Sequence, residues 1–421
     1  MCDRTCLKIE EIDNFIESIQ KKSTDLFSCF EKIALHNQQK VLAAFRQNKI
    51  ALRHFSGSSG YAYDDIGREA LSKVFAHTFN KESAIVSPLF GSGTHTIAVA
   101  LFGLTRPNDT ILSISGKVYD TLQKVIKGNC GSLNEYGIKF ESVNLTEQTE
   151  FDFDKIKNSI NKYNPSIVYI QRAKGYEWRK ALTVGQINEV AKFIKKITDA
   201  SIIVDNCYGE FTEFEEPDVN LIMGSLIKNP GGGFALTGGY IAGDRNLIEK
   251  IGSRYSAPGL GFDIGANPYG YQYYFQGFFM APHVVLQAMK AAALFSEVFS
   301  TLGYKTLGAI STDEISKSQK PLTQSDITCA IKFNSAEELI KFCQSIQAVS
   351  PVDSHVVPVP SPMPGYKNEV IMASGSFVQG SSIELSADAP IREPYIAYFQ
   401  GGLTYEHAKI ALKEVLLNIL K

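Results

Sequence analysis

The central part of the chain alternates short apolar runs with amphipathic segments. Apolar residues dominate runs of strand length at 83–90, 110–115, 138–145, 166–172, 201–208, 221–229 and 238–243. Between them, apolar positions recur three and four residues apart, as expected for helices, at 94–104, 117–126, 152–163 and 183–197. Strands separated by helices indicate βαβ crossovers. The pattern therefore predicts an α/β fold, with a mostly parallel sheet covered by helices.

The flanking segments carry different patterns. Apolar residues three and four apart predict helices over 8–50, and a loop rich in Gly, Ser and Tyr follows. One long helix is expected over 281–303, and the rest of the chain mixes short strands, helices and a Pro-rich loop. We therefore predict three parts: a helical segment over 1–55, a large α/β domain over 56–300, and a small α+β domain over 301–421.

Composition limits the class of function. The 421 residues are 44% hydrophobic and 20% charged with a net charge of −2, as in a soluble globular protein that binds neither nucleic acid nor an anionic membrane. The amino terminus lacks a signal-peptide pattern, and no apolar stretch is expected to reach the ~20 residues of a membrane helix. We expect a cytoplasmic protein. Cysteines and histidines form no CxxC or HExxH pattern, so neither a disulfide framework nor a metal site is expected.

Polar residues gather where the predicted strands end. They lie in the loops 90–96, 115–120, 171–179 and 205–210, which follow the first, second, fourth and fifth strands. Ligands of open parallel sheets bind beyond the carboxyl ends of the strands. All four loops are therefore expected to face one crevice.

The loop "GSGTHT", residues 91–96, leads straight into a predicted helix. Free backbone N–H groups and the helix dipole make such a start an anion site, and the two glycines allow a phosphate to approach. The loop matches neither GxGxxG nor GxxxxGK[ST]. Taken by itself, the loop is better explained as an ordinary strand–helix turn.

Two charged residues lie at the ends of apolar runs. Asp205 follows three apolar residues, and a buried carboxylate is costly unless it is paired. It is either a turn residue or the counter-ion of a buried cation. Lys228 follows the apolar pair Leu226 and Ile227. It is either a lysine whose stem packs on the core, or a desolvated amine of lowered pKa that forms a Schiff base.

Taken together, these features favour one cofactor, pyridoxal 5'-phosphate. The loop would hold its phosphate, Asp205 would keep its pyridine nitrogen protonated, and Lys228 would form the imine. Ser225 would add a hydroxyl to the phosphate. The glycines at 231–233 would let the chain turn sharply beside the cofactor.

The sequence resembles fold-type-I pyridoxal-phosphate enzymes of the cysteine/methionine metabolism group. It is most similar to the bacterial aluminium resistance, or methionine gamma-lyase-like, family. The stretches that carry the resemblance are "GYAYDDIGRE", "GSGTHTIAVALFG", "VYIQRAKGYEWRKALT", "VDNCYGEF", "SLIKNPGGGFALTGGYIAG", "QGFFMAPHVV" and "SADAPIREPYIAYFQGGLTYEHAK". It implies the aspartate aminotransferase-like fold, an amino-acid substrate, and a homo-oligomer that is at least a dimer and usually a tetramer.

The resemblance also implies roles for individual residues. Gly93 and Thr94 would bind the phosphate, and Tyr119 would stack on the pyridine ring and assist proton transfer. Lys228 would be both imine lysine and proton shuttle. Four residues would line the pocket, namely Gln171, Arg172, Trp178 and Arg179. Arg392 would bind the substrate carboxylate, and three residues would reach into a neighbouring subunit's site, namely Tyr61, Tyr63 and Arg68.

Four of these side chains also have a structural alternative. Tyr119 could be a packing residue and Trp178 an anchor, while Arg68 could cap a helix and Arg392 could form a surface ion pair. The sequence also departs from the group, because Ile227 precedes Lys228 where the group usually has Ser or Thr. The stretch 259–277 is unusually rich in tyrosine, which leaves the substrate open.

The expected reaction is elimination of a thiol from the β or γ carbon of a sulfur-containing amino acid, with Lys228 removing the α-proton. An aminotransferase on the same fold uses the same lysine and aspartate. A non-catalytic protein that binds pyridoxal phosphate is the third alternative.

Overall fold

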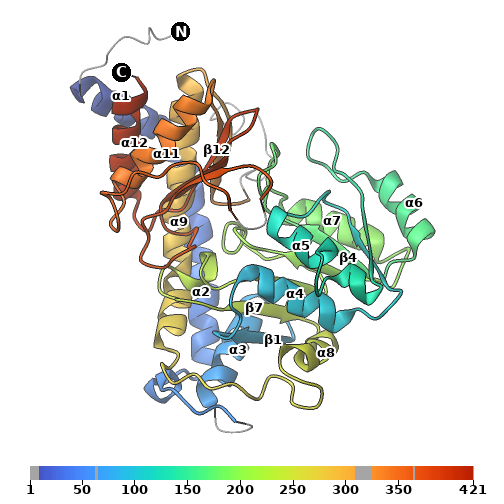
Figure 1. Ribbon diagram of the computed structural model, residues 1–421. Coiled ribbons are helices and arrows are strands. Elements are labelled where there is room, and N and C mark those ends of the chain that lie inside the picture. The colour runs from blue at the N-terminus through green and yellow to red at the C-terminus, as the bar shows by residue number, and fades with distance from the viewer. Residues whose placement is uncertain (1–8, 62–64, 309–324, 364–365, 421) are drawn as a thin grey trace.

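The computed structural model describes residues 9–61, 65–308, 325–363 and 366–420 (Figure 1). Its larger sheet has seven strands in the order β1-β7-β6-β5-β4-β2-β3. Their bounds are β1 Ser83–Ser87, β2 Thr110–Ser113, β3 Lys139–Ser142, β4 Ile167–Gln171, β5 Ser201–Asp205, β6 Leu221–Ser225 and β7 Gly239–Gly243. The strands from β2 to β6 pair in parallel, whereas β7 is antiparallel to both of its neighbours. The predicted mostly parallel sheet is confirmed.

Alternating side chains of the central strands enter two separate cores, because successive residues of a strand point to opposite faces. On β4, Val168 and Ile170 belong to one apolar cluster, while Ile167 and Tyr169 belong to the other. The helices that carry these clusters are α3 Ile66–Thr78, α4 Gly93–Leu104, α5 Asp120–Lys127, α6 Phe153–Tyr163, α7 Val184–Ile194 and α8 Arg245–Tyr255. Helices therefore cover both faces of the sheet (Figure 1).

A smaller sheet follows in the order β10-β11-β12-β9-β8, with every pair antiparallel. Its strands are β8 Lys305–Leu307, β9 Thr328–Lys332, β10 Val370–Ala373, β11 Ser386–Pro390 and β12 Ile396–Gln400. The helix α11 Ala336–Ala348 packs against it, and α12 Tyr405–Ile419 packs against α11. This C-terminal part of the chain is α+β, as predicted from the sequence.

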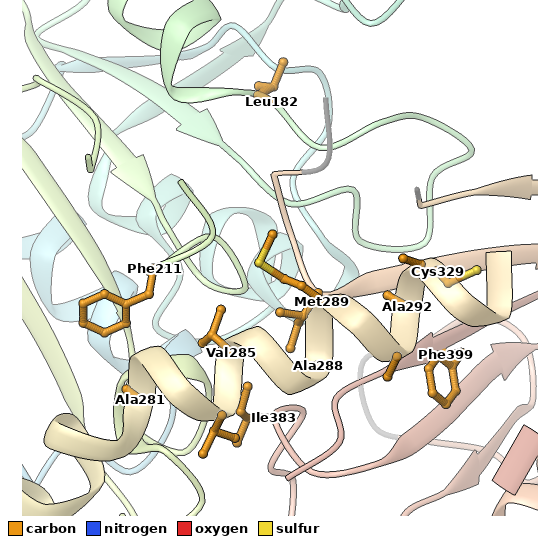
Figure 2. Packing of buried hydrophobic residues seen from close by; sticks show 14 of the residues in the cluster. Leu182, Phe211, Ala281, Val285, Ala288, Met289, Ala292, Cys329, Ile383 and Phe399 are labelled. Atoms are coloured by element: carbon orange, nitrogen blue, oxygen red, sulfur yellow. The ribbon is translucent and has the colours of Figure 1, made fainter. Parts of the chain in front are cut away.

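The long helix α9, Gln272–Thr301, joins the two sheets (Figure 1). Figure 2 shows apolar side chains from both halves of the chain gathered along it, among them Phe211 and Phe399. The helix begins before the predicted 281 and runs through Pro282. A proline inside a helix costs about 3 kcal/mol, and the burial of Pro282 and of most of α9 offsets that cost. By length and composition α9 also passes the test for a membrane span, which corrects the sequence expectation, but most of it is buried as a core helix.

The amino-terminal helices pack on distant parts of the chain. α1, Ile9–Lys22, contacts α12, and α2, Thr24–Gln47, lies along α9 (Figure 1). The first and last helices of the chain are therefore neighbours in space. The domain boundaries at 55 and 300 stay a prediction.

Candidate active site

A cavity of about 570 Å³ opens at the carboxyl ends of the parallel strands. Gln171, Asp205 and Ser225 are the last residues of β4, β5 and β6, and all three line it. Residues of the loops that follow β1 and β2 complete the wall. The prediction that the four polar loops face one crevice is confirmed, and the cavity has the size of a small-molecule site.

The start of α4 forms one wall of this cavity. The Ser92 side chain caps the helix by accepting a hydrogen bond from the His95 N–H at 3.0 Å. The first N–H groups of any helix lack a partner within the helix, so those of Gly93 and Thr94 can bind an anion. A Cβ at Gly93 would lie 3.2 Å from the Cβ of Ser225, so glycine keeps this approach open.

Ser225 closes the same corner of the cavity from β6. Its hydroxyl is buried and has no hydrogen-bond partner among the described residues. A buried polar group without a partner is uncommon and needs an explanation. A phosphate held by the start of α4 and by Ser225 supplies one, so the residues present fit the cofactor.

Replacing this hydroxyl is expected to have opposite effects on the two states of the protein. In Ser225→Ala, the apoprotein should melt at the same or a slightly higher temperature, because a buried unsatisfied group is removed. The affinity for pyridoxal phosphate should fall about tenfold or more, because a hydrogen bond to a charged group is lost. Thermal melting and equilibrium dialysis measure the two effects. A destabilised apoprotein with unchanged affinity would assign Ser225 a structural role.

Asp205 lies at the end of β5 and is only 4% exposed. Its carboxylate accepts hydrogen bonds from the Cys207 N–H at 3.2 Å and the Tyr169 hydroxyl at 3.4 Å. Burial raises the pKa of Asp205, while the neighbouring Lys228 acts in the opposite direction. This carboxylate is thus ready to pair with a cationic group in the cavity.

Lys228 faces the same cavity, and its Nζ lies 4.1 Å from the centre of the Tyr208 ring. Burial by itself lowers the pKa of Lys228, but Cys207, Tyr208 and Asp205 outweigh it and hold the pKa above the ordinary value. The sequence expectation of a lowered pKa is therefore wrong for the protein alone.

Tyr119 is the capping residue of α5 and joins two walls of the cavity. Its hydroxyl lies 3.1 Å from the Thr94 hydroxyl, and its N–H donates to Gln171 Oε1 at 2.9 Å. Burial raises the pKa of Tyr119, so its phenol stays protonated at neutral pH. Gln171 thus lines the pocket as expected and also fixes the start of α5.

Three predicted pocket residues lie outside the cavity wall. Arg172 is fully buried and forms ion pairs with Glu213 at 2.8 Å and Glu216 at 3.3 Å. Arg179 donates to the carbonyls of Gln171 and Ala173, and Trp178 is 39% exposed. The prediction that Arg172, Trp178 and Arg179 line the pocket is wrong. Gln171 and Arg172 are neighbours in an extended chain, so only the first faces the ligand side.

The segment predicted to reach a neighbouring subunit also lies away from the cavity. Arg68 is buried, and its guanidinium donates to the Asp263 carbonyl at 3.0 Å. Tyr61 is 71% exposed, and Tyr63 lies outside the described residues. Their role in a neighbour's site stays a prediction.

The smaller sheet contributes residues that sequence reasoning missed. Asp388 of β11 lines the cavity, as do Tyr398 and Gln400 of β12. Asp388 could have been found, because it interrupts an apolar strand as Asp205 does. Arg392 lies at the same wall, but it is exposed, and its role toward a carboxylate stays a prediction.

Comparison with known proteins agrees with this geometry. A structure of the YhfS protein from Escherichia coli, described as pyridoxal-5'-phosphate dependent, is similar with a TM-score of 0.59 and 15% identity, covering 91% of this chain and 95% of that one. At that identity the likeness concerns the fold alone. The fold is that of the fold-type-I pyridoxal-phosphate enzymes.

Closer relatives define the family. The model of the methionine gamma-lyase family matches residues 12–420. YnbB of Bacillus subtilis (strain 168) is 44% identical over 390 residues, which are 91% of this chain and 90% of YnbB. A solved carbon-sulfur lyase involved in aluminum resistance, from Clostridium novyi NT, is 43% identical with a TM-score of 0.90, covering 97% of this chain and 96% of that one. The chain belongs to the methionine gamma-lyase family.

Proposed function

We propose that this protein is a pyridoxal-phosphate-dependent lyase that cleaves the carbon–sulfur bond of a sulfur-containing amino acid. The observation that carries the proposal is the pair of Lys228 and Asp205, which face one cavity beside the anion site at the start of α4. Membership of the methionine gamma-lyase family supports the type of reaction.

Each part of the cofactor has a suitable residue. The N–H groups of Gly93 and Thr94 and the Ser225 hydroxyl would hold its phosphate. Asp205 would pair with its ring nitrogen, and Tyr119 would lie against the ring. Lys228 would hold its aldehyde carbon. When bound, the cofactor serves as an electron sink for the charge that develops at the α carbon.

The chain's own residues then bind the substrate and move its protons. Once the substrate amine has displaced the amine of Lys228, the freed Lys228 amine takes the α-proton of the substrate. The phenol of Tyr119 is protonated at neutral pH and would donate a proton to the departing sulfur. Arg392 would bind the substrate carboxylate at the cavity wall, through two parallel hydrogen bonds.

A product assay tests this proposal against its alternatives. Purified protein loaded with the cofactor is incubated with cystathionine, methionine or cysteine, and thiol, ammonia and 2-oxo acid are measured. A lyase forms all three products without any added oxo acid. Product formation that requires an added oxo acid would identify an aminotransferase. A colourless protein that does not respond to added cofactor would contradict both enzyme proposals and favour a non-catalytic protein.

We further propose a cytoplasmic homo-oligomer, at least a dimer and, as is usual in the group, a tetramer. Tyr61, Tyr63 and Arg68 would then contribute to a neighbour's site. Sedimentation of the cofactor-loaded protein measures the assembly, and a monomer with full activity would contradict it.

A further inference from the structure

The wall of the cavity formed by the smaller sheet carries a carboxylate that the proposed reaction does not use. Asp388 is the middle residue of β11, and it is partly exposed while the other four residues of the strand are buried. The exposure is toward the cavity, which Asp388 lines. Its register partner on β12 is Tyr398, which lines the same wall.

Asp388 has hydrogen-bond donors but no ion pair among the residues that the structure describes. Gln400 donates to it at 3.3 Å, and the Tyr176 side chain hydrogen-bonds to it. Burial raises the pKa of Asp388 to about 7, with Tyr176 and Lys228 acting in the opposite direction. Because Lys228 also neighbours Asp205 and would be committed to the cofactor, the ionised form of Asp388 would need another cation.

Three tyrosines surround this acid. The Tyr176 ring lies 5.1 Å from the Tyr398 ring and 5.7 Å from the Tyr366 ring, measured between centroids, and all three residues line the cavity. Aromatic faces attract ammonium groups, and more strongly where water is excluded. A carboxylate within a group of tyrosines is therefore suited to an ammonium ion rather than to a methyl group.

We propose that Asp388, with Tyr176, Tyr366 and Tyr398, forms a subsite for a second ammonium group of the substrate. This inference rests on the proposed lyase function and narrows its substrate class to diamino acid thioethers. Cystathionine carries such a group, whereas methionine ends in a methyl group.

A matched pair of compounds tests the subsite. S-(2-aminoethyl)cysteine and S-(2-hydroxyethyl)cysteine have the same length and differ only in the terminal ammonium or hydroxyl. The wild-type protein is expected to prefer the aminoethyl compound about tenfold or more in kcat/KM. In Asp388→Asn, which keeps the size of the side chain, that ratio should fall close to one.

Glu177→Gln is the matched control. Glu177 lies on the same cavity wall, but its carboxylate already forms an ion pair with Arg179 at 3.0 Å. Its loss should therefore leave the ratio between the two compounds unchanged. A ratio near one in the wild type, or an equal loss of both activities in Asp388→Asn, would overturn the subsite.

Binding separates this inference from the lyase proposal. The dissociation constants of both compounds are measured by calorimetry on Lys228→Ala loaded with the cofactor, with and without Asp388→Asn. The preference for the ammonium compound should appear there without turnover and disappear with Asp388→Asn. Absence of thiol release from the wild type would contradict the lyase alone, and absence of the binding preference would contradict the subsite alone.

Discussion

Lys228→Ala is expected to lose the covalent link to pyridoxal phosphate and to lower turnover roughly 10³-fold or more, because one amine serves as both anchor and base. Lys228 lies in the same cavity as Asp205 and Ser225. Borohydride reduction followed by peptide mapping should fix the cofactor at residue 228 of the wild type and at no residue of the variant.

Lys367→Ala is the control for this experiment. Lys367 also lines the cavity but is exposed at its rim. Its loss should leave the reduced adduct at Lys228 in place. An adduct found at another lysine, or full turnover by Lys228→Ala, would refute the assignment of the anchor and with it the proposed mechanism.

Arg172→Ala is expected to destabilise the protein by about 3–5 kcal/mol, because the buried carboxylate of Glu216 and the partly buried one of Glu213 lose their cation. The guanidinium is fully buried between Glu213 and Glu216 and also donates to Asn206 at 2.7 Å. Asn206 directly follows Asp205, so the affinity for the cofactor should fall as well. Urea unfolding of the apoprotein measures the change in the free energy of unfolding.

Lys155→Ala provides the comparison at the surface. Lys155 forms an ion pair with Asp152 at 2.8 Å, but its side chain is 73% exposed. Such a pair contributes about 0–1 kcal/mol, so its loss should hardly change unfolding. If Arg172→Ala lowers the free energy of unfolding no more than Lys155→Ala does, the ion pairs of Arg172 with Glu213 and Glu216 do not stabilise the fold.

The cofactor-binding side of the cavity was predictable because its signals are local. Asp205 and Lys228 each interrupt an apolar run, and the glycines of "GSGTHT" precede a helix. Apolar strands, polar strand ends and helix starts follow from burial and hydrogen bonding within a few residues. The structure brings these segments to one cavity, as the rule for parallel sheets requires.

The errors came from features that depend on contacts between distant segments. The charge of Arg172 suggested a substrate contact, but the side chain turns to carboxylates more than forty residues further along the chain. The pKa of Lys228 was expected to be lowered by burial, but the groups around it raise it. Neither the contacts of Arg172 nor the pKa of Lys228 can be predicted from the residues adjacent to them in the sequence.

The sequence by itself determined the order of strands and helices, the family, and the residues suited to pyridoxal phosphate, since these depend on neighbours in the chain. Only the tertiary structure decided which side of each strand end faces the ligand. It also brought β11 and β12 against the large sheet's cavity, with α9 packed between the two halves. Asp388 and its tyrosines meet Lys228 only there, because long-range packing and strand register place them.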